Sequence, residues 1–211
     1  MTTLIADPRV TGISVRECAE PLVTLDWIAG PAAGPARMVR EGLAGRLALA
    51  RQLLPEGLLL HLSEGYRPVA AQRAIVNSYA ARLRAAHPGL DGADLDRLTS
   101  RYVAPVEVAP HVAGAAVDIT LADCFGRPLW MGCELDATPE ESDGACYFDA
   151  EAIGEEARAN RRLLGRVLTA AGLVNYPTEW WHWSYGDQYW AHVTGAAVAV
   201  YGPVAPSLVA A

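Results

Sequence analysis

Helix and strand patterns follow one another in an irregular order along this 211-residue chain, and that order limits its fold more than any other feature. Helical spacing or helix start and stop signals mark three segments: 41–54, 68–87 and 154–172. Apolar or alternating runs typical of strands mark four others: 57–65, 115–121, 173–177 and 179–185. A doubly wound parallel sheet needs a regular alternation of strands and helices. We therefore predict an α+β fold with a central antiparallel sheet flanked by helices.

Local signals set the boundaries of these segments. Pro55 follows the first helical segment, Pro68 opens the second at the first-turn position that helices tolerate, and Gly172 lies at the end of the third. Residues 122–150 are polar and rich in Pro, Gly, Asp and Glu, which predicts a long loop. Loops of this length inside a compact domain are usually functional, so we expect this one to contribute to a site.

Length and composition bound the class of protein. A chain of 211 residues with 52% hydrophobic residues suits one domain over 1–211. The 17 Lys and Arg against 24 Asp and Glu give a net charge of -7, which repels a phosphate backbone and argues against nucleic acid as a partner. The first residues lack the regions of a secretory signal, and no apolar run approaches the ~18 residues of a membrane span. We expect a cytoplasmic protein with no membrane partner.

Cysteine does not indicate a metal site in this chain. The four cysteines, Cys18, Cys124, Cys133 and Cys146, form no C-x-x-C pair. A thiolate zinc site or a thioredoxin-type motif is therefore not predicted. We expect these residues to be reduced and to act as small apolar side chains.

Two of the five histidines have an acid at a spacing that chemistry can use. His111 precedes Asp118 by seven residues, and Gly114 between them allows the chain to turn so that both side chains point into one pocket. Asp118 is also a single acid in the apolar alternation of a strand, where a carboxylate is costly unless it meets a cation. Glu179 precedes His182 by three residues, among tryptophans that would form a dry wall around a polar site.

Two histidines and a carboxylate can hold a zinc ion that keeps one coordination position open for water. A further glutamate that is not a ligand can take the proton of that water and deliver it to a leaving amine. The same residues also fit two hydrogen-bonded core histidines with acids nearby, because H-x6-D and E-x-x-H are short patterns. The residue types alone leave both interpretations open.

Four sequence blocks occur in a fixed order: EGYRP at 64–68, HVAGAAVDITL at 111–121, MGCELD at 131–136 and EWWHW at 179–183. Together with the run NRRLLGRVLTAAGLVNYPTEWWH at 160–182, they resemble the M15-type zinc metallopeptidases, and within them the D-alanyl-D-alanine dipeptidases, the type that includes vancomycin-resistance enzymes. The resemblance runs from about residue 40 to about residue 190, whereas residues 1–40 match the family poorly. It implies the α+β fold of the M15 and hedgehog-like zinc peptidases, with the metal on the concave face of the sheet.

By position, the resemblance implies that His111, Asp118 and His182 hold one zinc ion per chain. Glu179 would act as general base and acid while a zinc-activated water attacks the scissile carbonyl. Arg67 would polarise that carbonyl and stabilise the oxyanion. The chemistry suits these residue types, because an arginine stays charged at physiological pH and a fixed cation aimed at developing charge contributes several kcal/mol.

Two further positions bear on the substrate that the resemblance implies. Asp136 aligns with an acid that faces the free amine of the substrate in the resistance enzymes. Ala109 stands where those enzymes carry a serine near the substrate, so a hydroxyl group that bonds the substrate is missing. The implied substrate is a small dipeptide, D-Ala-D-Ala or a near relative, with its identity and chirality left open. Glycopeptide resistance and the recycling of D-alanine are both open as roles, and the sequence gives no oligomeric state.

Two other functions compete with the dipeptidase. Another M15 activity, a DD- or LD-carboxypeptidase or an endopeptidase acting on peptidoglycan stems, would normally need export and an open groove. A non-hydrolytic zinc-binding relative would require neither Glu179 nor Arg67, and Ala109 is the substitution that supports it. The missing export signal and the long loop at 122–150 count against the first alternative, and the presence of Glu179 and Arg67 counts against the second. The sequence therefore favours the dipeptidase.

Overall fold

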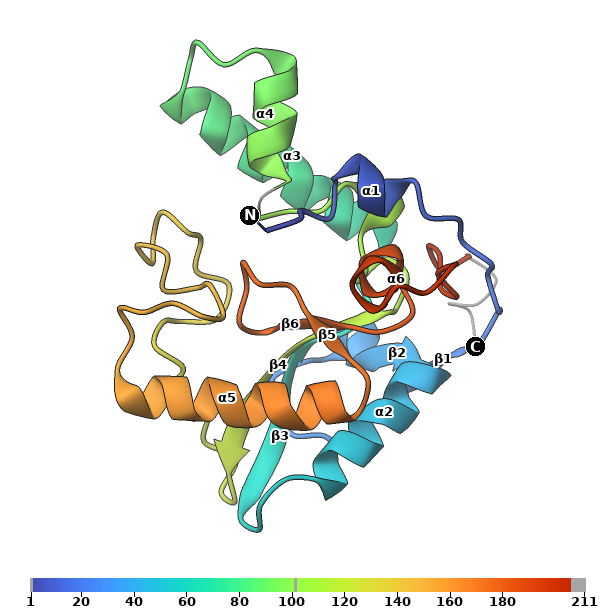
Figure 1. The fold of residues 1–211 in the computed structure, drawn as a ribbon, viewed down its shortest axis with the longest axis vertical. Helices are drawn as coiled ribbons and strands as arrows, with labels where there is room; N and C mark the ends of the chain where they lie inside the picture. Colours follow the sequence, from blue (N-terminus) through green and yellow to red (C-terminus); the bar gives the residue numbers. More distant parts are fainter. Residues whose placement is uncertain (1, 101, 206–211) are drawn as a thin grey trace.

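The computed structural model describes residues 2–100 and 102–205 as a chain of mixed helices and strands (Figure 1). The elements in chain order are α1 (Pro8–Thr11), β1 (Leu22–Thr24), η1 (Gly34–Arg37), β2 (Met38–Arg40), α2 (Glu41–Gln52), β3 (Leu58–Glu64), α3 (Val69–Ala86), α4 (Gly92–Thr99), η2 (Val106–Val108), β4 (Ala116–Asp123), α5 (Glu155–Ala170), β5 (Val174–Asn175), β6 (His182–Ser184) and α6 (Gln188–Thr194), where η1 and η2 are short 3-10 helices. None of the helices described is long and apolar enough to cross a membrane.

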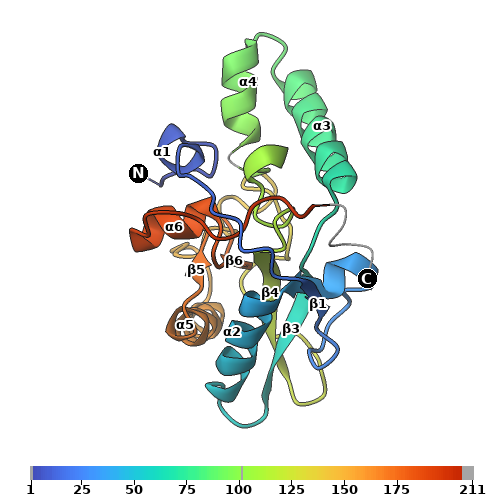
Figure 2. The same ribbon diagram turned by 90° about the vertical axis from the view of Figure 1, so that its right-hand side faces the viewer.

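The central sheet has four strands in the order β3-β4-β6-β5, and all three pairings are antiparallel. Helices α2 and α5 lie side by side on one face of this sheet (Figures 1 and 2). Strands β1 and β2 form a separate antiparallel pair. This arrangement confirms the predicted α+β class with an antiparallel sheet.

The main core lies between the sheet and the two helices that cover it. Helix α5 turns Leu164, Val167 and Leu168 inward, at the spacing that places them on one helical face. Strand β4 is buried from Ala116 to Ala122, so its neighbours cover both of its faces. Burying a leucine-sized side chain contributes about 1.5–3 kcal/mol, so a core of this kind holds β4 firmly in place.

The three predicted helices are present as α2, α3 and α5, and the first two predicted strands as β3 and β4. The two aromatic segments were predicted to be longer strands than they are. Only Val174–Asn175 and His182–Ser184 pair, whereas the residues from 176 to 181 form a turn. After the Tyr176 amide bonds the His182 carbonyl, the chain leaves the ladder, and the Trp180 amide donates to the carbonyl of Cys146 on the long loop at 2.9 Å.

Helices α3 and α4 form a hairpin that rises away from the sheet (Figures 1 and 2). The sequence pattern did not predict α4. This helix begins after Asp91, and the Asp91 side chain caps it by accepting a hydrogen bond from the Asp94 amide at 2.8 Å. The N-terminal segment packs against α6, where the Gln188 side chain donates to the carbonyl of Ile13 at 2.8 Å. This contact brings Ile5 into a small apolar cluster at the edge of the sheet.

Candidate metal centre and active site

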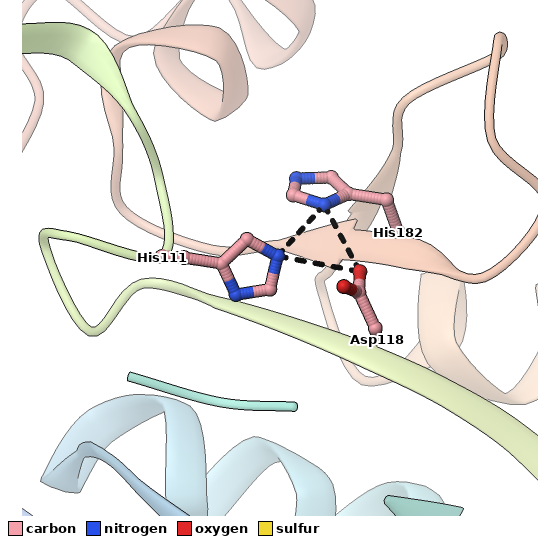
Figure 3. A group of neighbouring side chains, drawn as sticks. All are labelled: His111, Asp118 and His182. Carbon is pink, nitrogen blue, oxygen red and sulfur yellow. Dashed lines mark hydrogen bonds and ion pairs between the residues drawn. The ribbon is translucent and has the colours of Figure 1, made fainter. Parts of the chain in front are cut away.

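Three buried side chains from different segments point toward one another (Figure 3). His111 comes from the loop before β4, Asp118 from β4 and His182 from the start of β6. His111 Nε2 lies 3.1 Å from His182 Nδ1 and 3.3 Å from Asp118 Oδ1, and His182 Nδ1 lies 3.2 Å from Asp118 Oδ1. The predicted convergence of His111 and Asp118 is thus observed, with His182 as the third member.

The backbone explains how these residues meet. Asp118 and His182 lie directly opposite each other in the antiparallel β4–β6 register, so their side chains share one face of the sheet. His111 joins them because the chain reverses at Gly114, which adopts a φ of +63°. Its amide donates to the His111 carbonyl at 3.0 Å, and a Cβ at this position would come within 2.5 Å of Leu22. Gly114 therefore plays the turning role that the sequence predicted.

The chemistry of these atoms fits a metal ion. His111 Nδ1 donates to the carbonyl of Gly65 at 2.7 Å, which leaves the lone pair of a neutral ring on Nε2. That lone pair faces the Asp118 carboxylate, which also carries only lone pairs when ionised. Around a tetrahedral ion with bonds of about 2.0–2.1 Å, neighbouring ligand atoms lie about 3.3 Å apart. The observed separations of 3.1 to 3.3 Å match that spacing.

The pKa shifts of Asp118 and His182 agree with the same interpretation. Burial alone would raise the pKa of Asp118, but the charge and hydrogen bonds of His111, with the hydrogen bond of His182, hold it well below its usual range. Burial lowers the pKa of His182, and the neighbouring His111 charge acts in the same direction. Burial alone would lower the pKa of His111, but the charge and hydrogen bond of Asp118 raise it. A metal ion at His111 Nε2 would therefore bind in place of a proton, beside a carboxylate that is already ionised.

Glu179 lies beside these three residues and is equally buried, with 7% of its surface exposed. Its Oε2 atom is 3.8 Å from His182 Nδ1. Burial, followed by the charges of Asp118 and Asp136, raises the pKa of Glu179 well above its ordinary value. Glu179 therefore adjoins His111, Asp118 and His182 but is not one of the three converging residues. A carboxyl group with a raised pKa in this position is suited to carrying a proton.

Arg67 precedes α3, and its backbone amide donates to the carbonyl of His111 at 3.1 Å. Its guanidinium forms a two-point ion pair with Glu64 and donates from Nη1 to the Gln72 side chain at 2.8 Å. Arg67 Nη2 lies 4.0 Å from Asp118 Oδ2. Burial opposes the charge of Arg67, but the hydrogen bond and charge of Glu64 raise its pKa. The result is a fixed cation next to the triad.

One cavity of about 180 Å³ joins these groups. Its lining includes all seven site residues that the sequence predicted: Arg67, Ala109, His111, Asp118, Asp136, Glu179 and His182. Asp136 belongs to the long loop after β4 and adopts a φ of +65°. Burial, together with the charges of Asp118 and Glu64, raises the pKa of Asp136 to about 6. Ala109 is buried in the wall and offers no hydroxyl group.

The sequence reading missed several residues that shape this cavity. Glu64 and Gln72 hold Arg67, Tyr102 donates its hydroxyl to the carbonyl of Asp136, and Ile5 adds an apolar wall from the N-terminal segment. Glu64 had a local signal, since it precedes Arg67 by three residues in EGYRP. The contacts of Gln72, Tyr102 and Ile5 depend on tertiary packing that no local pattern records.

Comparison with known proteins gives consistent matches. The model of the M15 peptidase family, described as D-ala-D-ala dipeptidase, matches residues 36–198. A D-alanyl-D-alanine dipeptidase of Synechocystis sp. is 30% identical over 236 residues, which cover 91% of this chain and 95% of that protein. A D-alanyl-D-alanine dipeptidase of Escherichia coli is 34% identical over 127 residues, covering 60% of this chain and 54% of that protein. Among solved structures, VanYB in complex with D-alanine-D-alanine aligns with a TM-score of 0.47 at 18% identity, covering 85% of this chain and 86% of that one.

Proposed function

The chain belongs to the M15 peptidase family and is a peptidase, and on this premise we propose that it is a zinc-dependent dipeptidase acting on D-alanyl-D-alanine or a closely similar small dipeptide. One observation carries the proposal. The buried triad of His111, Asp118 and His182 adjoins a separate glutamate, Glu179, inside one small cavity. This is the division of roles, three ligands and one proton carrier, that metal-assisted hydrolysis needs.

In this proposal zinc is held by His111 Nε2, Asp118 Oδ1 and His182 Nδ1. When bound, the ion supplies a water whose pKa falls to about 7 and an electrophile for the peptide carbonyl. The chain contributes the orientation of the ligands. The Gly65 carbonyl fixes the tautomer and direction of His111, and the β4–β6 register fixes the other two.

Glu179 takes the proton of the attacking water and passes it to the leaving amine. Its position supports both steps, because its Oε2 atom lies 3.8 Å from His182 Nδ1, a proposed ligand atom, and the residue is buried. Its raised pKa makes the carboxylate a stronger base toward the attacking water than an ordinary glutamate, and the protonated group can then donate to the leaving amine.

Arg67 stabilises the negative charge that develops on the carbonyl oxygen. Its guanidinium is held by Glu64 and Gln72 before the substrate arrives, so little reorganisation is needed when charge develops. Asp136 provides a negative charge at the cavity wall for the substrate's free ammonium group. An ammonium ion beside Asp136 would offset the burial that raises the pKa of this carboxyl group.

The small volume of the cavity supports a dipeptide over a peptidoglycan stem. About 180 Å³ accommodates a ligand of few heavy atoms, and the N-terminal Ile5 and the α3 residue Ile75 both belong to its lining. A free ammonium recognised by Asp136 also distinguishes a dipeptide from a longer peptide, in which that nitrogen is an amide.

A substrate panel tests the proposal. Zinc-loaded protein is incubated with the four stereoisomers of Ala-Ala and with N-acetyl-D-Ala-D-Ala, and free alanine is measured. We expect the D,D dipeptide to be cleaved fastest and the acetylated compound, which lacks the ammonium, to be cleaved poorly. Efficient cleavage of the acetylated compound alone would favour a carboxypeptidase, and no cleavage of any dipeptide would contradict the proposal.

The variant Glu179→Gln separates hydrolysis from metal binding. We expect it to retain one zinc ion and to lose about 10²–10⁴-fold in kcat, the usual contribution of a general acid–base group. Unchanged turnover would assign the proton transfer elsewhere or point to a non-hydrolytic role for the site.

A further inference from the structure

The turn between β5 and β6 carries Glu179 and leads directly into His182, the first residue of β6. Three backbone hydrogen bonds close it. The Tyr176 amide donates to His182 O at 3.0 Å, the Glu179 amide to Tyr176 O at 2.9 Å, and the His182 amide to Glu179 O at 3.3 Å. The last of these is long, so the direct backbone link between Glu179 and His182 is weak.

The side chain of Asn175 spans the same turn. Its Nδ2 atom donates to the carbonyl of Glu179 at 3.0 Å and to the carbonyl of His182 at 2.9 Å. An amide nitrogen carries two N–H groups, so each carbonyl receives one of them. Asn175 itself is anchored in β5, where it pairs with Trp183 of β6. One side chain therefore ties the backbone of both residues to the sheet.

We infer that Asn175 is a positioning residue that sets the distance between the proton carrier Glu179 and the metal ligand His182. This inference rests on the proposed function of the site. The side chains of Glu179 and His182 approach to 3.8 Å, and a shift of either carbonyl would move the corresponding side chain relative to the triad. Groups behind the ligands of a metal site commonly change metal affinity or activity by about 10–100-fold when they are removed.

The chemistry of the amide makes the inference specific. Asn175→Asp keeps the size of the side chain, but an ionised carboxylate has no hydrogen to donate and places negative charge against two carbonyl oxygens. Asn175→Ala removes both donors and the volume. If Asn175 only fills space, the Asp variant should be closer to the wild type than the Ala variant. If its two donors matter, the Asp variant should be as impaired as the Ala variant or worse.

A matched control is available on α5. Asn160 also donates one side-chain hydrogen bond to a backbone carbonyl, that of Trp130 at 3.0 Å, but does not line the cavity. The experiment compares Asn175→Asp, Asn175→Ala and Asn160→Ala with the wild type. Zinc affinity is measured by competition with a chelator, and kcat and KM are measured with D-Ala-D-Ala at saturating zinc.

We expect both Asn175 variants to bind zinc about tenfold or more weakly and to lose at least about tenfold in kcat, with KM little changed. Asn160→Ala should match the wild type in all three quantities. Asn175→Gln, which keeps the amide on a longer stem, should recover part of the zinc affinity and provides a comparison if the smaller variants fold poorly.

Wild-type zinc affinity and kcat in Asn175→Asp would overturn the inference, as would equal losses in the Asn160 control. The proposed function is judged separately, on the wild type. If the wild type binds zinc but cleaves no dipeptide, the proposed function fails, while the zinc affinities of the variants still decide the role of Asn175.

Discussion

The two halves of the cavity are built differently. The half proposed to hold the metal, called the metal half below, stands on the central sheet, where Asp118 and His182 occupy opposed positions of adjacent strands. The half proposed to hold the substrate, called the substrate half, is built from segments outside the sheet, with Asp136 on the long loop after β4 and Ile5 on the N-terminal segment. Regular strands fix geometry through many backbone hydrogen bonds, whereas loops depend on a few side chains. The proposed function therefore predicts that substitutions in one half leave the role of the other half intact.

Arg161 shows how few side chains hold the loop. This buried α5 residue donates to the carbonyls of Met131 at 2.6 Å, Tyr147 at 2.6 Å and Ala145 at 2.7 Å. These acceptors lie on both sides of Asp136 in the sequence. Burial lowers the pKa of Arg161, which indicates that the position is costly for a cation. The cost of burying this charge is offset by its hydrogen bonds to the carbonyls, which hold the loop that carries Asp136.

The largest effect should follow from removing a residue of the metal half. In Asp118→Ala, the two histidines lose the carboxylate that completes the triad, so we expect zinc content to fall from one ion per chain toward zero and hydrolysis to fall to background. Metal analysis after dialysis checks this. His87→Ala, an exposed histidine at the end of α3, is the control and should keep its zinc.

Substituting the fixed cation should have a smaller effect. Arg67→Lys keeps the charge but loses the fork that bonds Glu64 and Gln72 together, so the charge is no longer held toward the carbonyl oxygen. We expect kcat/KM to fall by about 10²–10³-fold with zinc content unchanged. A variant that lost zinc in proportion to activity would place Arg67 in the metal half instead.

Asp136→Asn should affect binding more than chemistry. The change removes a negative charge from the wall while keeping the shape of the side chain. We expect KM for D-Ala-D-Ala to rise by about 10–100-fold, in line with loss of a charged hydrogen bond, and kcat to change much less. An equal loss in kcat and no change in KM would show that Asp136 acts in the chemical step.

The smallest effect on chemistry should come from Arg161→Met. The hydrogen bonds of Arg161 go to loop carbonyls and not to the residues that line the cavity. Its loss leaves several buried carbonyls without a donor, so we expect a lower midpoint of thermal unfolding. At a temperature where the variant is folded, KM should rise several-fold while zinc content and kcat stay near the wild-type values. Loss of zinc in the folded variant would show that the two halves are coupled.

The sequence predicted the chemical groups of the site better than the backbone that carries them. His111, Asp118 and Glu179 were recognisable because their spacing, the turn at Gly114 and the apolar alternation of β4 are local features. The segment 179–185 was wrongly extended as a strand, since its aromatic composition favours strands. Residues 176–181 are instead held in a turn by the side chain of Asn175, which bonds two carbonyls of this region, and by the carbonyl of Cys146 on the long loop. The aromatic composition records neither contact.

The supports of the substrate half were largely invisible in the sequence. Helix α4 is short and its cap at Asp91 lies directly after the Pro88-Gly89 break, so its pattern resembles a loop. Tyr102 and Ile5 carry no local mark of their contacts with the cavity. Arg161 lies in a helical segment with several charged residues, where an arginine is ordinarily exposed to solvent. In the folded protein it is buried, and it bonds carbonyls of the loop that packs against α5.

Anomalous diffraction at the zinc edge from crystals of the zinc-loaded protein tests the central claim most directly. The account predicts one strong peak within about 2.0–2.2 Å of His111 Nε2, Asp118 Oδ1 and His182 Nδ1, with Glu179 outside the bonding distance. A peak bonded to Glu179, a peak at another site, or no peak between the two histidines would contradict it.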